Sequence, residues 1–200
     1  MIVAVAAALV IVLAVQSFGP PGEKLGAALR ATARWSFLWF CLATTGSALT
    51  SLFGANFQWL AQRGRDFGLA FASAHLVHLT LVARLLYVSA GPFPRPQLIF
   101  FGLGVVWTYL LALLSVSGSL RATLSPKAWR TIRTIGVEYI AFAFLSEFAG
   151  RAFHGGVASF LIYLPFLTLA LAGPLLRIAA LGKRWRAALA EERLKPGHAA

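Results

Sequence analysis

The sequence predicts an all-α membrane protein, a polytopic bundle of six transmembrane helices. Of its 200 residues, 59% are hydrophobic and only 12% are charged, and the mean hydropathy is +0.77. Soluble domains have an apolar share nearer 45–50%. The apolar residues also gather in runs of about 20, the length that crosses a hydrocarbon core. We therefore expect the lipid bilayer to be the main partner of this chain.

The net charge of +12 does not indicate a nucleic-acid-binding protein. The Lys and Arg residues lie in short connections between apolar runs and at the C-terminal end. In these places they act as topology signals and headgroup contacts. We therefore expect no nucleic acid as a partner.

The first two expected helices differ in character. Residues 1–17 form an apolar first transmembrane helix, somewhat short for a full span, with no basic segment before it and a Gly-Pro-Pro-Gly turn after it. The second helix is expected from about Arg34 to Phe53. Its later half is rich in small and hydroxylic residues around Gly46, which predicts close packing against another helix.

The third and fourth spans are separated by a proline-rich loop. Residues 65–88 are apolar and long enough to cross the bilayer, with His75 and His78 near their middle. The Gly-Pro-Phe-Pro-Arg-Pro loop at residues 91–96 ends this span. The fourth span is expected from about Gln97 to Leu120.

The fifth and sixth spans complete the predicted bundle, with the second to fifth forming a four-helix core. Pro126 is placed to open the fifth helix at its first turn, and the span itself is expected from about Ile132 to Ala149. The sixth is expected from about Val157 to Leu176, with kinks at its two prolines. Residues 181–200 are expected to form a basic amphipathic tail at the membrane surface that ends in a frayed segment.

The distribution of positive charge predicts the orientation. Twelve of the 18 Lys and Arg residues lie on the side of the predicted topology that holds the N-terminus, and six lie on the other. Because positive residues concentrate in the cytoplasm, both termini are predicted to be cytoplasmic. The first helix alone favours the opposite orientation, since basic residues follow it and none precedes it. A five-span chain with an interfacial or cleaved first segment is the alternative.

The two membrane histidines are the first candidate site. His75 and His78 are three residues apart and share one helix face. Ionisable groups at this depth are costly and are often functional. One hypothesis is that they ligate haem, and the other is that each ring bonds a carbonyl or hydroxyl of a neighbouring helix and holds the bundle together.

The fifth span carries two carboxylates. Glu147 and Arg151 are four residues apart, which predicts an ion pair near the helix end. Glu138 lies deeper. We expect it either to contact one of the membrane histidines or to reach the surface beside Arg130 or Arg133.

Four short segments carry a resemblance to a known family. They are Arg-Trp-Ser-Phe-Leu from Arg34, Arg-Asp-Phe-Gly-Leu from Arg65, Leu-Leu-Ser-Val-Ser closing the fourth span, and Lys-Ala-Trp-Arg-Thr-Ile-Arg from Lys127. In this order they resemble the ferric reductase-like transmembrane domain over residues 30–180. The similarity is to the small stand-alone bacterial type, like the haem-bearing membrane subunit of the methionine sulfoxide reductase system. The resemblance implies a bacterial-type inner (cytoplasmic) membrane, haem b, and a separate redox partner.

The ligand set implied by the resemblance is only partly present. His78 lies where the family has its third-span haem ligand, and His75 is an additional histidine one turn earlier. In the fifth span the family has a Trp followed four residues later by a histidine, with another about thirteen residues on. Here the corresponding residues are Trp129, Arg133 and Ser146, and neither of the last two is a haem ligand.

Three interpretations of the cofactor follow. Haem b could be five-coordinate on His78, shared between two copies in a homodimer, or absent. His78 is expected to lie nearer the membrane midplane, and His75 to find water or a hydroxyl more easily.

Two functions follow from these interpretations. The chain has no HExxH or GxSxG motif, no phosphate-binding glycine loop and no soluble flavin or nicotinamide domain. It is therefore at most the membrane electron-transfer subunit of an oxidoreductase. The alternative is a haem-free scaffold or accessory subunit of a membrane complex.

Overall fold

The computed structural model describes residues 1–18, 23–88 and 94–193, and every regular element in this part of the chain is helical. The predicted turn at residues 19–22, the start of the loop at 91–96 and the frayed C-terminal end with His198 lie outside the described residues. The elements in chain order are α1 (Ile2–Phe18), α2 (Lys24–Phe53), the 3-10 turn η1 (Ala55–Phe57), α3 (Gln58–Gln62), α4 (Gly64–Val88), α5 (Arg95–Val116), α6 (Gly118–Ala122), α7 (Pro126–His154) and α8 (Gly156–Arg193).

Four helices are long and apolar enough to cross a membrane: α2, α4, α5 and α8. This confirms the predicted class of helical membrane protein. The helix α1 is apolar but has 17 residues, about 26 Å at 1.5 Å per residue, slightly less than a hydrocarbon core of about 30 Å. The helix α7 is long enough, but charged residues are spread along its whole length.

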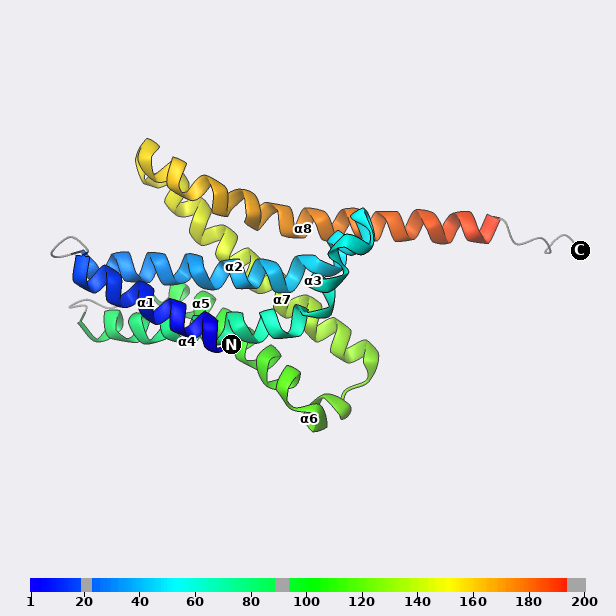
Figure 1. Ribbon diagram of the computed structural model, residues 1–200, viewed down its shortest axis with the longest axis horizontal. Coiled ribbons are helices and arrows are strands. Elements are labelled where there is room, and N and C mark those ends of the chain that lie inside the picture. The colour runs from blue at the N-terminus through cyan, green and yellow to red at the C-terminus, as the bar shows by residue number, and fades with distance from the viewer. Residues whose placement is uncertain (19–22, 89–93, 194–200) are drawn as a thin grey trace, which may run out of the picture.

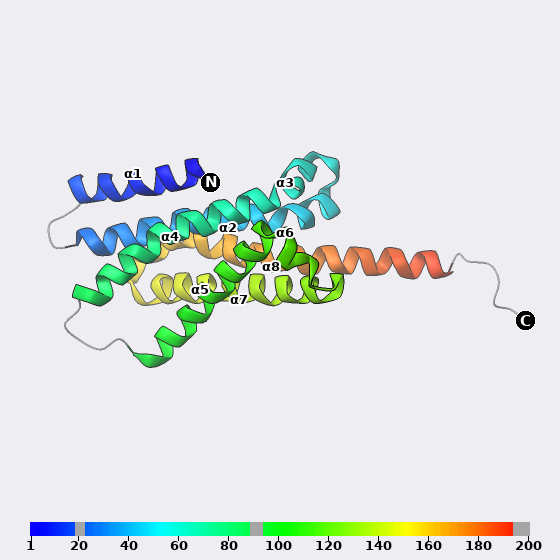
Figure 2. The ribbon, with the colours of Figure 1, turned by 90° about the horizontal axis from the view of Figure 1, so that it is seen from below.

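The long helices alternate in direction. In Figures 1 and 2 the short elements that join α2 to α4 and α5 to α7 lie towards the end of the bundle from which α8 leaves. The chain turns back at the opposite end between α7 and α8. The described connections that hold Arg63, Arg121 and Lys127 therefore lie towards the same end of the bundle.

Several predicted boundaries agree with the structure. The histidine helix α4 runs from Gly64 to Val88, which confirms the expected span at residues 65–88. The helix α7 begins at Pro126, as predicted, and the hydroxyl of Ser125 caps it by accepting a hydrogen bond from the Ala128 N–H at 3.1 Å. Proline suits this position because the first helical N–H has no partner within the helix.

Two helices are longer than predicted. The helix α2 already begins at Lys24, because the Ala- and Leu-rich segment before Arg34 consists of strong helix formers. Arg34 therefore lies well inside α2, where its guanidinium carbon is 4.4 Å from the ring centre of Tyr163 in α8.

The helix α8 is one helix of 38 residues, not a span followed by a separate tail helix. It runs through both Pro165 and Pro174 and extends about 57 Å, so that its C-terminal part projects beyond the other helices (Figure 1). The Lys183 ammonium ties this part to the end of α2 by donating to the Ser51 carbonyl at 2.8 Å.

The core is built around α2. This helix packs against α1, α4 and α8, while α4 contacts α5, α5 contacts α7, and α7 contacts α8, so five helices close a ring. The main cluster of buried side chains includes Tyr163, Leu167 and Ala170 of α8. The sequence predicts a core formed by the second to fifth spans. The buried cluster also includes side chains of α8, so the core is not limited to those four.

Small residues allow close approach at two places. A Cβ added at Gly46 of α2 would lie 2.7 Å from the backbone of Leu60 and Ala61, so α3 packs directly on the α2 backbone, as the small residues of α2 predicted. Nearer the start of α2, the Trp35 indole N–H donates to the carbonyl of the buried Ala4 at 3.0 Å and fixes α1.

Candidate functional site: the membrane histidines and an arginine-lined cavity

His78 is held by a hydrogen bond between two helices. Its Nδ1 lies 3.0 Å from the hydroxyl oxygen of Thr32 on α2, and Thr32 is fully buried. The Thr32 hydroxyl also donates to the Ala28 carbonyl at 2.8 Å, so in the tautomer that carries its proton on Nδ1 His78 donates to the Thr32 oxygen. This is the bond to a neighbouring helix that one of the two hypotheses predicted.

His75 has a different environment. Its ring lies 5.3 Å from that of His78, 5.4 Å from Phe71 and 6.3 Å from Phe144 of α7. Its Nδ1 is buried and has no hydrogen-bond partner in the described part of the chain. The nearby hydroxyl of Thr32 lies opposite the next turn of α4 and bonds His78, not His75.

The surroundings do not fit a six-coordinate haem. Such a haem needs axial ligands on both sides of the ring. On the α7 side the position nearest the histidines is filled by Phe144, whose ring contacts Phe71 as well as His75. His154 is ten residues further along α7, about 15 Å at the helical rise, and bonds the Gly150 carbonyl through Nδ1.

Glu138 has a partner that the sequence did not suggest. Both of its carboxylate oxygens accept hydrogen bonds at 2.8 Å from the guanidinium of Arg177 on α8. No hydrogen bond or ion pair in the described part of the chain joins Glu138 to a membrane histidine, Arg130 or Arg133, although its side chain is 46% exposed. The predicted pair of Glu147 and Arg151 is confirmed.

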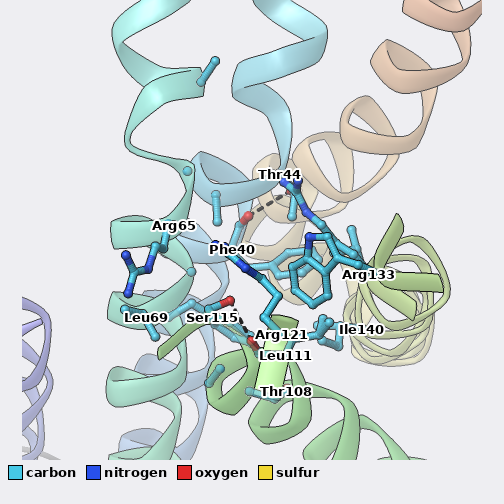
Figure 3. A pocket seen from close by; sticks show the side chains of 18 of the residues that line it. Phe40, Thr44, Arg65, Leu69, Thr108, Leu111, Ser115, Arg121, Arg133 and Ile140 are labelled. Carbon is cyan, nitrogen blue, oxygen red and sulfur yellow. Dashed lines mark hydrogen bonds between the residues drawn. The ribbon is translucent and has the colours of Figure 1, made fainter. Parts of the chain in front are cut away.

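Arg133 instead lines a cavity of about 320 Å³ at the end of the bundle where the basic residues gather. Residues from α2, α3, α4, α5, α6 and α7 surround this cavity. In Figure 3 the side chains of Arg121 and Arg133 extend into the space between the helices, whereas the side chain of Arg65 points outward.

The cavity is cationic at its mouth and apolar at its base. Among the residues that the structure describes, no acidic side chain lines it. Ile140, at the base, is seven residues beyond Arg133 on α7 and so about 10 Å deeper. The base is completed by Phe40, Phe71 and Leu111, while the hydroxyl of Thr108 also lines it and is bonded to the Gly104 carbonyl of its own helix.

Sequence reasoning missed this cavity. Arg121 and Arg133 are twelve residues apart, and the basic segment between the fourth and fifth spans suggested only a topology signal. The short helix α6 brings Arg121 back towards α7, and nothing in the hydrophobic pattern marks that turn.

The fold and the length of the apolar helices define the chain as a helical membrane protein. No protein-family model matches the chain, and no curated protein or solved structure matches it. Function must therefore be argued from the geometry of the two sites described above.

Proposed function

We propose that this chain is a haem-free, multi-pass subunit of a membrane complex, a scaffold or accessory protein with a ferric reductase-like architecture. The observation that carries the proposal is the environment of the histidine pair. Phe144, whose side chain cannot ligate iron, packs on the α7 side of His75, and Thr32 gives His78 a structural partner. The histidines then serve to join α4 to α2 and to fill the centre of the bundle.

The proposal includes a bacterial-type inner membrane with six crossings and both termini in the cytoplasm. Its support is the alternation of the long helices and the concentration of Lys and Arg at one end of the bundle. The helix α7 can cross although it is charged, because Glu138 pairs with Arg177 and Glu147 pairs with Arg151.

A second candidate function is electron transfer by a five-coordinate haem b on His78, with a separate redox partner. One observation favours it. A histidine that ligates a metal usually donates its other ring N–H to a neighbouring acceptor, and His78 donates Nδ1–H to Thr32 in this way. Haem would supply one-electron redox chemistry, and the chain would orient the imidazole through Thr32.

Absorption spectroscopy separates the two functions. The full chain is expressed with added haem precursor and purified in detergent, and its spectra before and after dithionite are compared with its haem content. The proposal expects less than about one haem per ten chains and no dithionite-sensitive Soret or α band. A stoichiometric haem that is lost in His78→Ala and kept in His75→Ala would overturn it in favour of electron transfer.

A further inference from the structure

The arginine-lined cavity has the features of a ligand site and not only of a topology signal. Basic residues that merely set orientation can lie anywhere in a loop and face water. Arg121 and Arg133 are also exposed, but they come from different helices and in Figure 3 both extend over the same cavity. Neither makes an ion pair or a side-chain hydrogen bond within residues 1–18, 23–88 and 94–193.

The shape and charge of the cavity select the class of ligand. Two guanidinium groups at the mouth suit a phosphate, because the planar fork of Arg matches its oxygens. The walls about 10 Å deeper are apolar, which suits a hydrocarbon chain. A ligand that satisfies both parts carries a phosphate at one end and an apolar chain at the other.

We propose that this cavity binds an anionic phospholipid, with its phosphate between Arg121 and Arg133 and part of one acyl chain against Phe71 and Ile140. Basic pockets between membrane helices on the cytoplasmic side are suited to lipid headgroups, which lie at that depth. The bound lipid joins α4, α5, α6 and α7 at the end of the bundle where the chain passes from α5 to α7 through the short helix α6. This inference goes beyond the proposed function and does not depend on haem.

Trp129 provides a reporter inside the site, since its side chain lines the cavity. The detergent-purified full chain is titrated with dibrominated phosphatidylglycerol or dibrominated phosphatidylcholine, whose bromines quench nearby tryptophans. The share of quenching that disappears in Trp129→Phe reports the cavity. We expect the quenching of Trp129 to reach half of its maximum at a phosphatidylglycerol concentration about ten times lower than the phosphatidylcholine concentration that has the same effect.

Variants at the mouth and the base test the two halves of the ligand. Arg121→Gln and Arg133→Gln should each weaken binding about tenfold, as expected for the loss of a charge-assisted hydrogen bond. Arg130→Gln is the matched control, because Arg130 is an exposed arginine of α7 that does not line the cavity, and it should change binding less than about twofold. Ala112→Phe should fill the cavity and abolish the preference for phosphatidylglycerol. This variant tests the proposal independently if an arginine variant folds poorly.

Three results would overturn the proposal. Equal quenching of Trp129 by the two brominated lipids, or an equal effect of Arg130→Gln and Arg133→Gln, would mean that general membrane electrostatics explains the contact. Inorganic phosphate is the probe for a soluble ligand. If it alone perturbed Trp129 with the same dependence on the two arginines, and Ala112→Phe left that effect intact, the site would take a soluble phosphate compound and not a lipid.

Discussion

Arg177 of α8 donates two parallel hydrogen bonds of 2.8 Å to the carboxylate of Glu138 on α7, 39 residues away in the sequence. The Arg177 side chain is 19% exposed and that of Glu138 is 46% exposed, so the pair is partly desolvated. A bidentate pair of this kind fixes the orientation of two helices as well as neutralising two charges. It is therefore a polar link between α7 and α8, in addition to the Ser159 hydroxyl that donates to the Arg151 carbonyl.

Breaking this pair should destabilise the bundle more than breaking the pair within α7. Glu138→Gln leaves the Arg177 charge without its partner in a partly buried place, and we expect a loss of about 1–3 kcal/mol in the free energy of unfolding. Glu147→Gln removes a pair of residues four apart on one helix and should cost less than about 1 kcal/mol. Both values can be measured by SDS titration in mixed micelles.

A double-mutant cycle on Glu138→Gln and Arg177→Gln isolates the interaction itself. We expect a coupling energy of about 1 kcal/mol or more between these two positions. Additive effects of the two substitutions would show that the two hydrogen bonds contribute nothing to stability.

The sequence predicted those features that depend on local chemistry. The apolar run with its flanking polar residues gave the bounds of α4 within one residue, and Pro126 after Ser125 marked the start of α7. The pair of Glu147 and Arg151 followed from helical spacing alone. Each of these depends on residues within a few positions of one another.

Features that depend on tertiary packing could not be predicted in the same way. The partner of Glu138 lies on a helix that hydropathy ended at Leu176, one residue before Arg177. Hydropathy limits that helix to the thickness of a membrane. The helix-forming residues after Leu176 continue α8 to Arg193. Which histidine meets Thr32, and which arginines meet over the cavity, depends on helix rotation that hydropathy does not report.

Close packing at Gly46 leads to a stability prediction. A methyl group there would lie 2.7 Å from backbone atoms of Leu60 and Ala61, which cannot move without displacing α3. Gly46→Ala should therefore cost about 1–3 kcal/mol of unfolding free energy. Gly102→Ala in α5 is the matched control, because nothing lies within 4 Å of the added Cβ, and it should cause no loss. Equal effects of the two substitutions in a thermal unfolding experiment would contradict the close contact.

The proposed topology can be tested with reporter fusions. Fusions after residues 60, 125 and 190 should all report the cytoplasm, because these positions lie at the end where Lys and Arg concentrate. A fusion after residue 155, between α7 and α8, should report the opposite side. A periplasmic signal at residue 125 would show that the proposed orientation is wrong. Protease access to a tag before Met1 would then show whether α1 crosses or lies in the interface.

The hydrogen bond between Thr32 and His78 predicts an asymmetry between the two membrane histidines. His78→Leu removes a partner of the fully buried Thr32 hydroxyl, whereas His75→Leu removes a ring whose buried Nδ1 has no partner among the described residues. In the haem-free protein we expect His78→Leu to cost about 1 kcal/mol more than His75→Leu in the free energy of unfolding.

The same bond can be measured directly with Thr32→Val, which keeps the shape of the side chain and removes the hydroxyl. The cycle of Thr32→Val and His78→Leu should give a coupling energy of about 0.6–1.5 kcal/mol, the usual range for a hydrogen bond between membrane helices. A cycle of Thr32→Val with His75→Leu is the control and should be additive, because the structure records no bond between those side chains. Coupling of Thr32 to His75 instead of His78 would mean that α4 is rotated relative to α2, and the contacts assigned to both rings would then be wrong.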